Sequence, residues 1–117
     1  MEVLRVVQDE LTPGAESELY ELIIPGQLVG KVVVDSAARM VGIIRSIRVS
    51  LPPLRVELVI KGLEVEFPID VSNVTAVGSV VQLKNVAKEA ETVELRDVQR
   101  LRKELIEEIR AIVGKGP

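Results

Sequence analysis

Residues 56–69 read Val-Glu-Leu-Val-Ile-Lys-Gly-Leu-Glu-Val-Glu-Phe-Pro-Ile, and this stretch decides the fold of the chain. Apart from Val59, apolar residues alternate with charged residues or Pro68 on both sides of Gly62. Alternation with a period of two places every second side chain on one face of a β-sheet. Gly62 between the two runs favours a tight turn. The stretch therefore predicts a β-hairpin with strands at 56–61 and 63–69.

The neighbouring segments extend this pattern, with further short strands predicted at 31–34, 41–49 and 79–84. The first two are separated by Asp35-Ser36-Ala37-Ala38-Arg39, whose Asp and Ser side chains favour a turn. Pro52-Pro53 ends the second strand, and residues 70–74 form a polar corner. Aromatic residues make up only 2% of the chain, so Val, Ile and Leu must build the core.

Five segments within residues 28–84 form a recognisable pattern: Leu28-Val29-Gly30-Lys31 with the following Asp35-Ser36, Val41-Gly42-Ile43-Ile44, Val56 to Gly62, Phe67-Pro68-Ile69-Asp70, and Val77 to Lys84. Together these segments resemble a PRC-barrel domain. One difference lies in the first turn, where Ala37-Ala38-Arg39 stands in place of the Asp-Gly that is common in the family. The resemblance covers about half of the chain. It implies an all-β fold, a small PRC-type barrel of about five or six strands, followed here by a C-terminal helix.

The first 27 residues form an acidic segment, with six acids against Arg5 alone and a net charge of −5. Residues 28–84, in contrast, carry a net charge of +2. Val3 to Val7 can form an extra edge strand, while residues 17–24 suit either a strand or a short helix. We favour a strand that leads into the barrel.

Residues 92–113 predict an amphipathic helix, because no Gly or Pro interrupts residues 93–113 and apolar residues recur at spacings of three and four. Thr92 is the expected N-cap. The apolar stripe consists of Val98, Leu101, Leu105, Ile109 and Ile112. It can pack on the barrel or on a second subunit, which makes Leu101, Leu105 and Ile109 candidate interaction residues.

Charged residues suggest two further features. On the predicted helix, Arg100 with Glu104 and Lys103 with Glu107 stand four residues apart, the spacing of ion pairs. On the predicted strands, a basic stripe is formed by Arg39, Arg45, Arg48 and Arg55, of which the last three are candidate interaction residues. Such a stripe can bind nucleic acid. A sequence pI near 5.1 and the presence of only two aromatic residues count against it.

The residue types that carry most protein chemistry are missing. The chain has neither His nor Cys, and therefore lacks the usual general base, thiolate nucleophile and zinc ligands. Asp70, Ser72 and Asn73 form the only compact group of oxygen-bearing residues, and a turn explains them better than a calcium site. We therefore expect no catalytic residue, metal or cofactor. With no signal peptide and no apolar run long enough for a membrane span, we expect a cytoplasmic protein without membrane insertion.

These observations predict a non-enzymatic adaptor, expected to be a homodimer, that binds other proteins. The resemblance implies a narrower setting, because similar stand-alone archaeal PRC-barrel proteins act in cell division with SepF, the membrane anchor of FtsZ. The alternative is a ribosome- or RNA-associated assembly factor similar to the barrel of RimM, which the arginines on the strands suggest.

Overall fold

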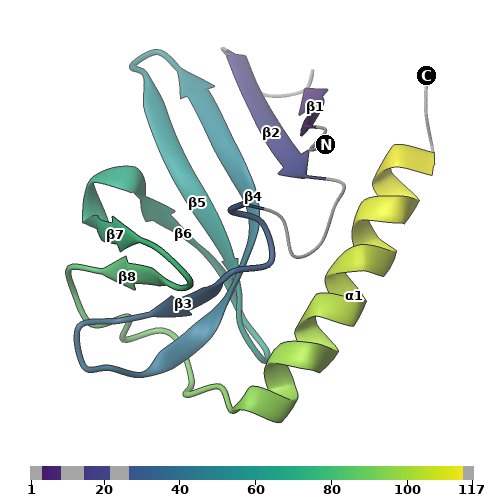
Figure 1. The fold of residues 1–117 in the computed structure, drawn as a ribbon. Coiled ribbons are helices and arrows are strands. Elements are labelled where there is room, and N and C mark those ends of the chain that lie inside the picture. Colours follow the sequence, from purple (N-terminus) through teal and green to yellow (C-terminus); the bar gives the residue numbers. More distant parts are fainter. Residues whose placement is uncertain (1–3, 9–14, 22–26, 115–117) are drawn as a thin grey trace.

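Eight strands and one long helix make up the described part of the chain (Figure 1). This computed structural model describes residues 4–8, 15–21 and 27–114. The strands are β1 (Leu4–Gln8), β2 (Ala15–Glu21), β3 (Val32–Val34), β4 (Met40–Leu51), β5 (Arg55–Lys61), β6 (Glu66–Asp70), β7 (Val74–Val77) and β8 (Val81–Leu83). A 3-10 helix, η1 (Val71–Asn73), joins β6 to β7, and helix α1 (Leu95–Gly114) ends the described chain.

Strand β4 is the centre of the sheet. Its residues 43–50 pair with β5, while on its other side residues 40–43 pair with β3 and residues 47–51 with β2. Beyond these, β1 pairs with β2, β6 with β5, and β8 runs parallel to β3 with β7 antiparallel at its side. Twelve residues in one strand thus hold both branches of the sheet together.

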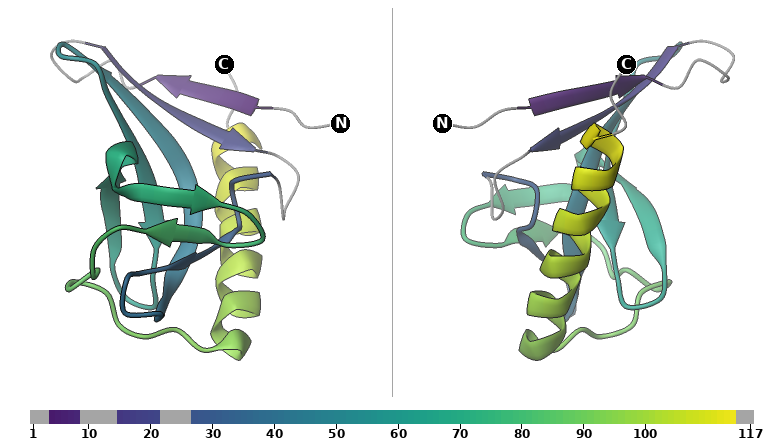
Figure 2. Two further views of the ribbon diagram at one scale, coloured as in Figure 1. Left: turned by 60° about the vertical axis from the view of Figure 1, so that its left-hand side comes forward. Right: turned by 90° about the vertical axis from the view of Figure 1, so that its right-hand side faces the viewer.

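The sheet is curled but does not close (Figures 1 and 2). Closure would require β6 to pair with β7, and no such pair occurs among the described residues. The structure therefore shows a β-rich fold with a C-terminal helix, and the predicted barrel is not confirmed. After β6 the chain turns away in η1. Asp70 is the N-cap of this 3-10 helix, and its side chain accepts a hydrogen bond from the Ser72 N–H.

The predicted hairpin at residues 56–69 is present, with a longer turn than expected. Leu58 lies opposite Ile69 and Ile60 opposite Phe67, and all four side chains are buried. The turn occupies residues 62–65 and is closed by a hydrogen bond from the Gly62 N–H to the Val65 carbonyl. Val65, predicted to face the core, is 42% exposed because it belongs to this turn rather than to a strand.

Residues of the acidic N-terminal segment form strands, not a short helix. Strand β2 pairs with β1 on one side and with β4 on the other, so the segment extends the central sheet. This hairpin lies toward the C-terminal end of α1 (Figure 2). Val3, and residues 22–24 of the predicted strand, lie outside the described residues.

Helix α1 packs its apolar stripe on the sheet of its own chain. Val98, Leu101, Leu105 and Ile109 are at most 4% exposed and belong to the same core cluster as the inner residues of β4 and β5. The helix begins at Leu95, later than the predicted Thr92 start. Its N-cap is Glu94, not Thr92, since the Glu94 carbonyl accepts from the Asp97 and Val98 N–H groups and the Glu94 N–H donates to Asp97 Oδ2.

Candidate functional site

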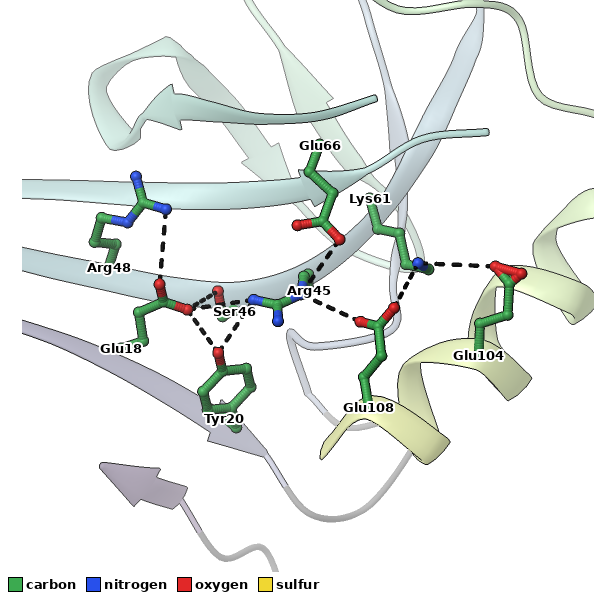
Figure 3. A network of polar contacts seen from close by, with 9 residues as sticks. All are labelled: Glu18, Tyr20, Arg45, Ser46, Arg48, Lys61, Glu66, Glu104 and Glu108. Atoms are coloured by element: carbon green, nitrogen blue, oxygen red, sulfur yellow. Dashed lines mark hydrogen bonds and ion pairs between the residues drawn. The ribbon is translucent and has the colours of Figure 1, made fainter. Parts of the chain in front are cut away.

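A β-bulge in β4 determines where its polar side chains point. Ile44 lies opposite Ile60 and Ser46 opposite Val59, which leaves Arg45 as an extra residue without a partner on β5. An extra residue bends a strand and redirects its side chains. The bulge places Arg45 between the sheet and helix α1, where it joins a network of polar contacts (Figure 3).

Arg45 binds carboxylates from three different elements. Its guanidinium lies 3.3 Å from Glu18 on β2, 3.5 Å from Glu66 on β6 and 3.3 Å from Glu108 on α1. The guanidinium also lies over the ring of Tyr20, 5.4 Å from its centroid. Arg45 is therefore a junction that ties the N-terminal hairpin, the central sheet and the helix together.

Glu18 is the hydrogen-bond acceptor at the β2 end of the network. The Tyr20 hydroxyl donates to Glu18 Oε2 at 2.6 Å, and the hydroxyl of fully buried Ser46 donates to the same oxygen at 3.2 Å. Burial alone would raise the pKa of Glu18, but these bonds and the nearby Arg45 and Arg48 hold it below the ordinary value. Burial, followed by the hydrogen bond to Glu18, raises the pKa of Tyr20 to about 12.

Lys61 forms the contact between the sheet and the middle of α1. Its Nζ lies 2.9 Å from Glu108 and 3.7 Å from Glu104, which stand one helical turn apart. Burial would raise the pKa of Glu108, but Lys61 and Arg45 hold it below the ordinary value. Strand alternation predicts Lys61 on the polar side of β5, yet it is only 9% exposed because α1 covers that end of the strand.

The arginines predicted to form a basic stripe do not present one. Arg48 lies 3.6 Å from Glu18, 3.9 Å from Glu16 and 4.0 Å from Glu57. In the whole network, Arg45, Arg48 and Lys61 face six carboxylates, so the charge of the bases is neutralised. Arg55, at the start of β5, is the one of the three candidate arginines whose side chain is exposed.

The candidate interaction residues of the helix are also engaged in contacts within the chain. Leu101 and Leu105 are fully buried and Ile109 is 4% exposed, all within the core of the same chain. Of the two packing partners left open by the sequence, the structure shows the chain's own sheet. In this arrangement the three residues stabilise the fold and are not accessible to a second protein.

A second buried carboxylate organises the turn after β3. Asp35 accepts hydrogen bonds from the backbone N–H groups of Ala37, Arg39 and Ala87, and its Oδ2 lies 3.0 Å from the Arg39 guanidinium. Arg39 also donates to the carbonyls of Ala87 and Ala90. Burial would raise the pKa of Asp35, but the backbone hydrogen bonds from Arg39 and Ala87 hold it below the ordinary value. The turn thus fixes the connection that leads to α1.

Glu21 at the end of β2 has a comparable structural role. It is 3% exposed and accepts hydrogen bonds from the backbone N–H groups of Gln27, Leu28 and Val29. The sequence did not single out Glu18, Glu21 or Glu108. The sequence pattern that comes closest to indicating this network is the pair Glu104 and Glu108, which stand four residues apart beside the apolar stripe of the predicted helix.

The pKa shifts show what this network can do chemically. The pKa values of Glu18, Asp35 and Glu108 are lowered and that of Tyr20 is raised, so each of these groups keeps one protonation state around neutral pH. A general acid or base needs a pKa near the working pH. The network is therefore suited to holding elements together rather than to transferring protons. No group of His, Cys, Asp and Glu within the described ranges is arranged to hold a metal ion.

Comparison with known proteins adds no relative. No protein-family model, no curated protein and no solved structure matches this chain. The resemblance to PRC barrels therefore stays a prediction. Across residues 4–8, 15–21 and 27–114, no helix has both the length and the apolar character for crossing a bilayer.

Proposed function

We propose that this chain is a non-enzymatic adaptor that binds other proteins through the outer edge of β7. The observation that carries the proposal is the open sheet, which leaves β7 paired with β8 on one side only among the described residues. A strand at the edge of a sheet offers backbone N–H and C=O groups to which an extended segment of another protein can add.

Strands β6 and β7, two of the edge strands of the curled sheet, differ in how they are protected. Strand β6 carries Glu66, Pro68 and Asp70, and charges and proline are the residues that keep edge strands from pairing. Strand β7 reads Val-Thr-Ala-Val without charge or proline, and residues 75–77 are exposed. Val77 is 55% exposed and Val71, just before the strand, is 47% exposed. These apolar side chains favour β7 as the binding edge.

The rigid frame behind the edge supports an adaptor role. Strand β7 is held by β8, which pairs with β3, and β3 pairs with the central strand β4. The Arg45 network then joins β4 to the helix. A preformed edge on such a frame loses little conformational entropy when a partner strand adds.

The edge is tested by placing a charge on it. In Val77→Lys we expect loss of the proteins that a tagged chain captures from a lysate of its source organism. Val86→Lys is the matched control, because Val86 is also exposed, at 44%, but lies outside the strands. Capture that is equal for both variants, with both folded by circular dichroism, would remove the edge from the proposal.

A homodimer is part of the proposal, and the buried helix stripe moves its expected contact to β7. Light scattering over a concentration series should show a dimer for the wild type and a monomer for Val77→Lys. A wild-type monomer at the highest concentration contradicts the dimer but leaves the adaptor role standing. Leu105→Asp is unsuitable for this test, because it would place a charge in the core.

The capture experiment also separates the narrower settings. Performed with and without ribonuclease, it would support a cell-division role if SepF is recovered in both cases. That setting depends on the PRC-barrel resemblance alone. Ribosomal proteins that disappear with ribonuclease would support the RNA-associated alternative instead. The ion pairs of Arg45 and Arg48 leave that alternative with less support than the sequence suggests.

A further inference from the structure

The solvent-facing side of α1 carries a row of bases. Its four members, called here the basic stripe of α1 to distinguish them from the arginines on the strands, are Arg96, Arg100, Lys103 and Arg110, all of which are exposed. Their spacings of four, three and seven residues place them on one face of the helix. At a rise of about 1.5 Å per residue the stripe is about 21 Å long. Glu107 is the only acid on the same face.

The stripe is left largely without acidic neighbours because Glu104 and Glu108 turn toward the sheet. The sequence predicts that Glu104 pairs with Arg100 and Glu107 with Lys103, but neither ion pair forms. Glu104 lies 3.7 Å from Lys61 instead, and Glu108 contacts both Lys61 and Arg45. Of the stripe, Arg96 pairs with Glu94 at 3.0 Å and Arg100 reaches Asp97 only at 4.0 Å. The first pair is weak because both side chains are exposed to solvent, and the second because its atoms lie at the limit of ion-pair distance.

One flank of the stripe is apolar. Leu95, Ile106 and Val113 share this flank by helical spacing. Leu95 is 75% exposed, the most exposed large apolar side chain of the described residues. Ile106 and Val113 are half-buried, and Val113 packs against the core on its inner side. The helix thus presents a row of positive charge beside a partly exposed apolar row.

We propose that this face of α1 binds an acidic amphipathic segment of another protein, about 15 residues long, that lies along the helix. The carboxylates of this segment would pair with the basic stripe of α1, and its apolar side chains would cover Leu95, Ile106 and Val113. The inference rests on the proposed adaptor function and names a partner chemistry for a surface separate from β7.

Features of the face favour an acidic protein segment over nucleic acid. Glu107 stands within the stripe, and a fixed negative charge repels a continuous row of phosphates. Tyr20 and Phe67 are 4% and 5% exposed, so neither can stack on a base. A protein segment can place a neutral or basic residue opposite Glu107, and it uses the apolar flank as well.

The test is a binding titration by fluorescence anisotropy with a labelled amphipathic peptide of Glu and Leu, about 15 residues long. Its counterpart with Gln in place of Glu is the probe control. The protein variant is Arg100→Gln/Lys103→Gln/Arg110→Gln. The matched protein control, Arg55→Gln/Lys84→Gln/Lys88→Gln, removes three exposed bases outside the helix. We expect at least about tenfold weaker binding of the Glu peptide for the helix variant and little change for the control.

A further variant gives a prediction of opposite sign. Glu107→Gln removes the negative charge from the stripe and should tighten binding of the Glu peptide, a result that a purely structural role of the face does not produce. Equal weakening by the helix variant and the matched control would overturn the proposal. So would binding of single-stranded RNA or of vesicles with anionic lipids to this face in the absence of peptide binding.

The two proposals fail independently. Val77→Lys changes the sheet edge and leaves the helix face intact, so it should bind the Glu peptide like the wild type. If Val77→Lys loses captured partners while the peptide still binds, both surfaces are supported. If the peptide does not bind but capture still depends on Val77, the helix face alone is rejected.

Discussion

At the scale of single residues, Gly42 is a position without room for a side chain. Its φ of 152° is rare for residues with a side chain, and an added Cβ would collide with the Lys61 carbonyl on the neighbouring strand. We expect Gly42→Ala to lower the free energy of unfolding by about 3 kcal/mol or more. Gly78→Ala is the control, because nothing lies near its Cβ position. Urea unfolding measures both, and equal effects would contradict the close approach.

Tyr20 reports on the network through its own titration. It is the only Tyr in a chain without Trp, so the near-ultraviolet absorbance of tyrosinate follows this residue alone. Burial and the bond to Glu18 raise its pKa from 10.0 to about 12. Neutral Tyr20 thus stabilises the fold below pH about 10, and this contribution is lost as the pH rises toward the higher value. Glu18→Gln should lower the pKa of Tyr20, and titration of the folded wild type near pH 10 would contradict the hydrogen bond.

Residue-level chemistry was the least predictable part of the sequence. The pattern in residues 41–49 indicates a strand, but it does not reveal that Arg45 is the extra residue of a bulge. A bulge depends on how two strands pair, and the local sequence does not contain that information. Glu18 could not be assigned to Arg45 for the same reason, because they meet only after β2 has paired with β4.

At the scale of elements, the contact between α1 and the sheet gives a direct test. Glu108→Gln removes the carboxylate shared by Lys61 and Arg45, and leaves these largely buried bases less compensated. We expect the free energy of unfolding to fall by about 1 kcal/mol. Glu107→Gln, one residue earlier but exposed, should change it by less than about 0.5 kcal/mol. Similar unfolding curves for the two variants would show that the contact does not stabilise the fold.

Most elements follow from local patterns, and the exceptions have physical causes. The runs at 31–34, 41–49 and 56–61 are strands because β-branched and alternating residues suit a pleated sheet. Strand β7 was missed, since its four residues follow a polar turn and show no alternation. The predicted helix start at Thr92 is too early. Thr is a favoured N-cap residue, but in the structure Glu94 and Asp97 form the cap.

At the scale of the whole molecule, we expect stability to fall in acid. The pKa values of Asp35, Glu18 and Glu108 are held below their ordinary values of 3.8 and 4.5. Each charged carboxylate thus stabilises the fold above its ordinary pKa, and the contribution is lost as the pH falls through the lowered value. Urea unfolding should show lower stability at pH about 3 than at pH about 6. Asp35→Asn should lower stability at neutral pH and reduce this dependence, and a stability that rises in acid would contradict the assignment.

The sequence by itself determined the helix and most of the strands, because side-chain alternation and helical spacing act over a few residues. It also determined that the chain lacks His and Cys. Only the tertiary structure decided that the sheet stays open and that Glu104 and Glu108 face Lys61 and Arg45 rather than the exposed bases of α1. These outcomes depend on strand pairing and on contacts between distant segments, such as Arg45 and Glu108, which local patterns do not encode.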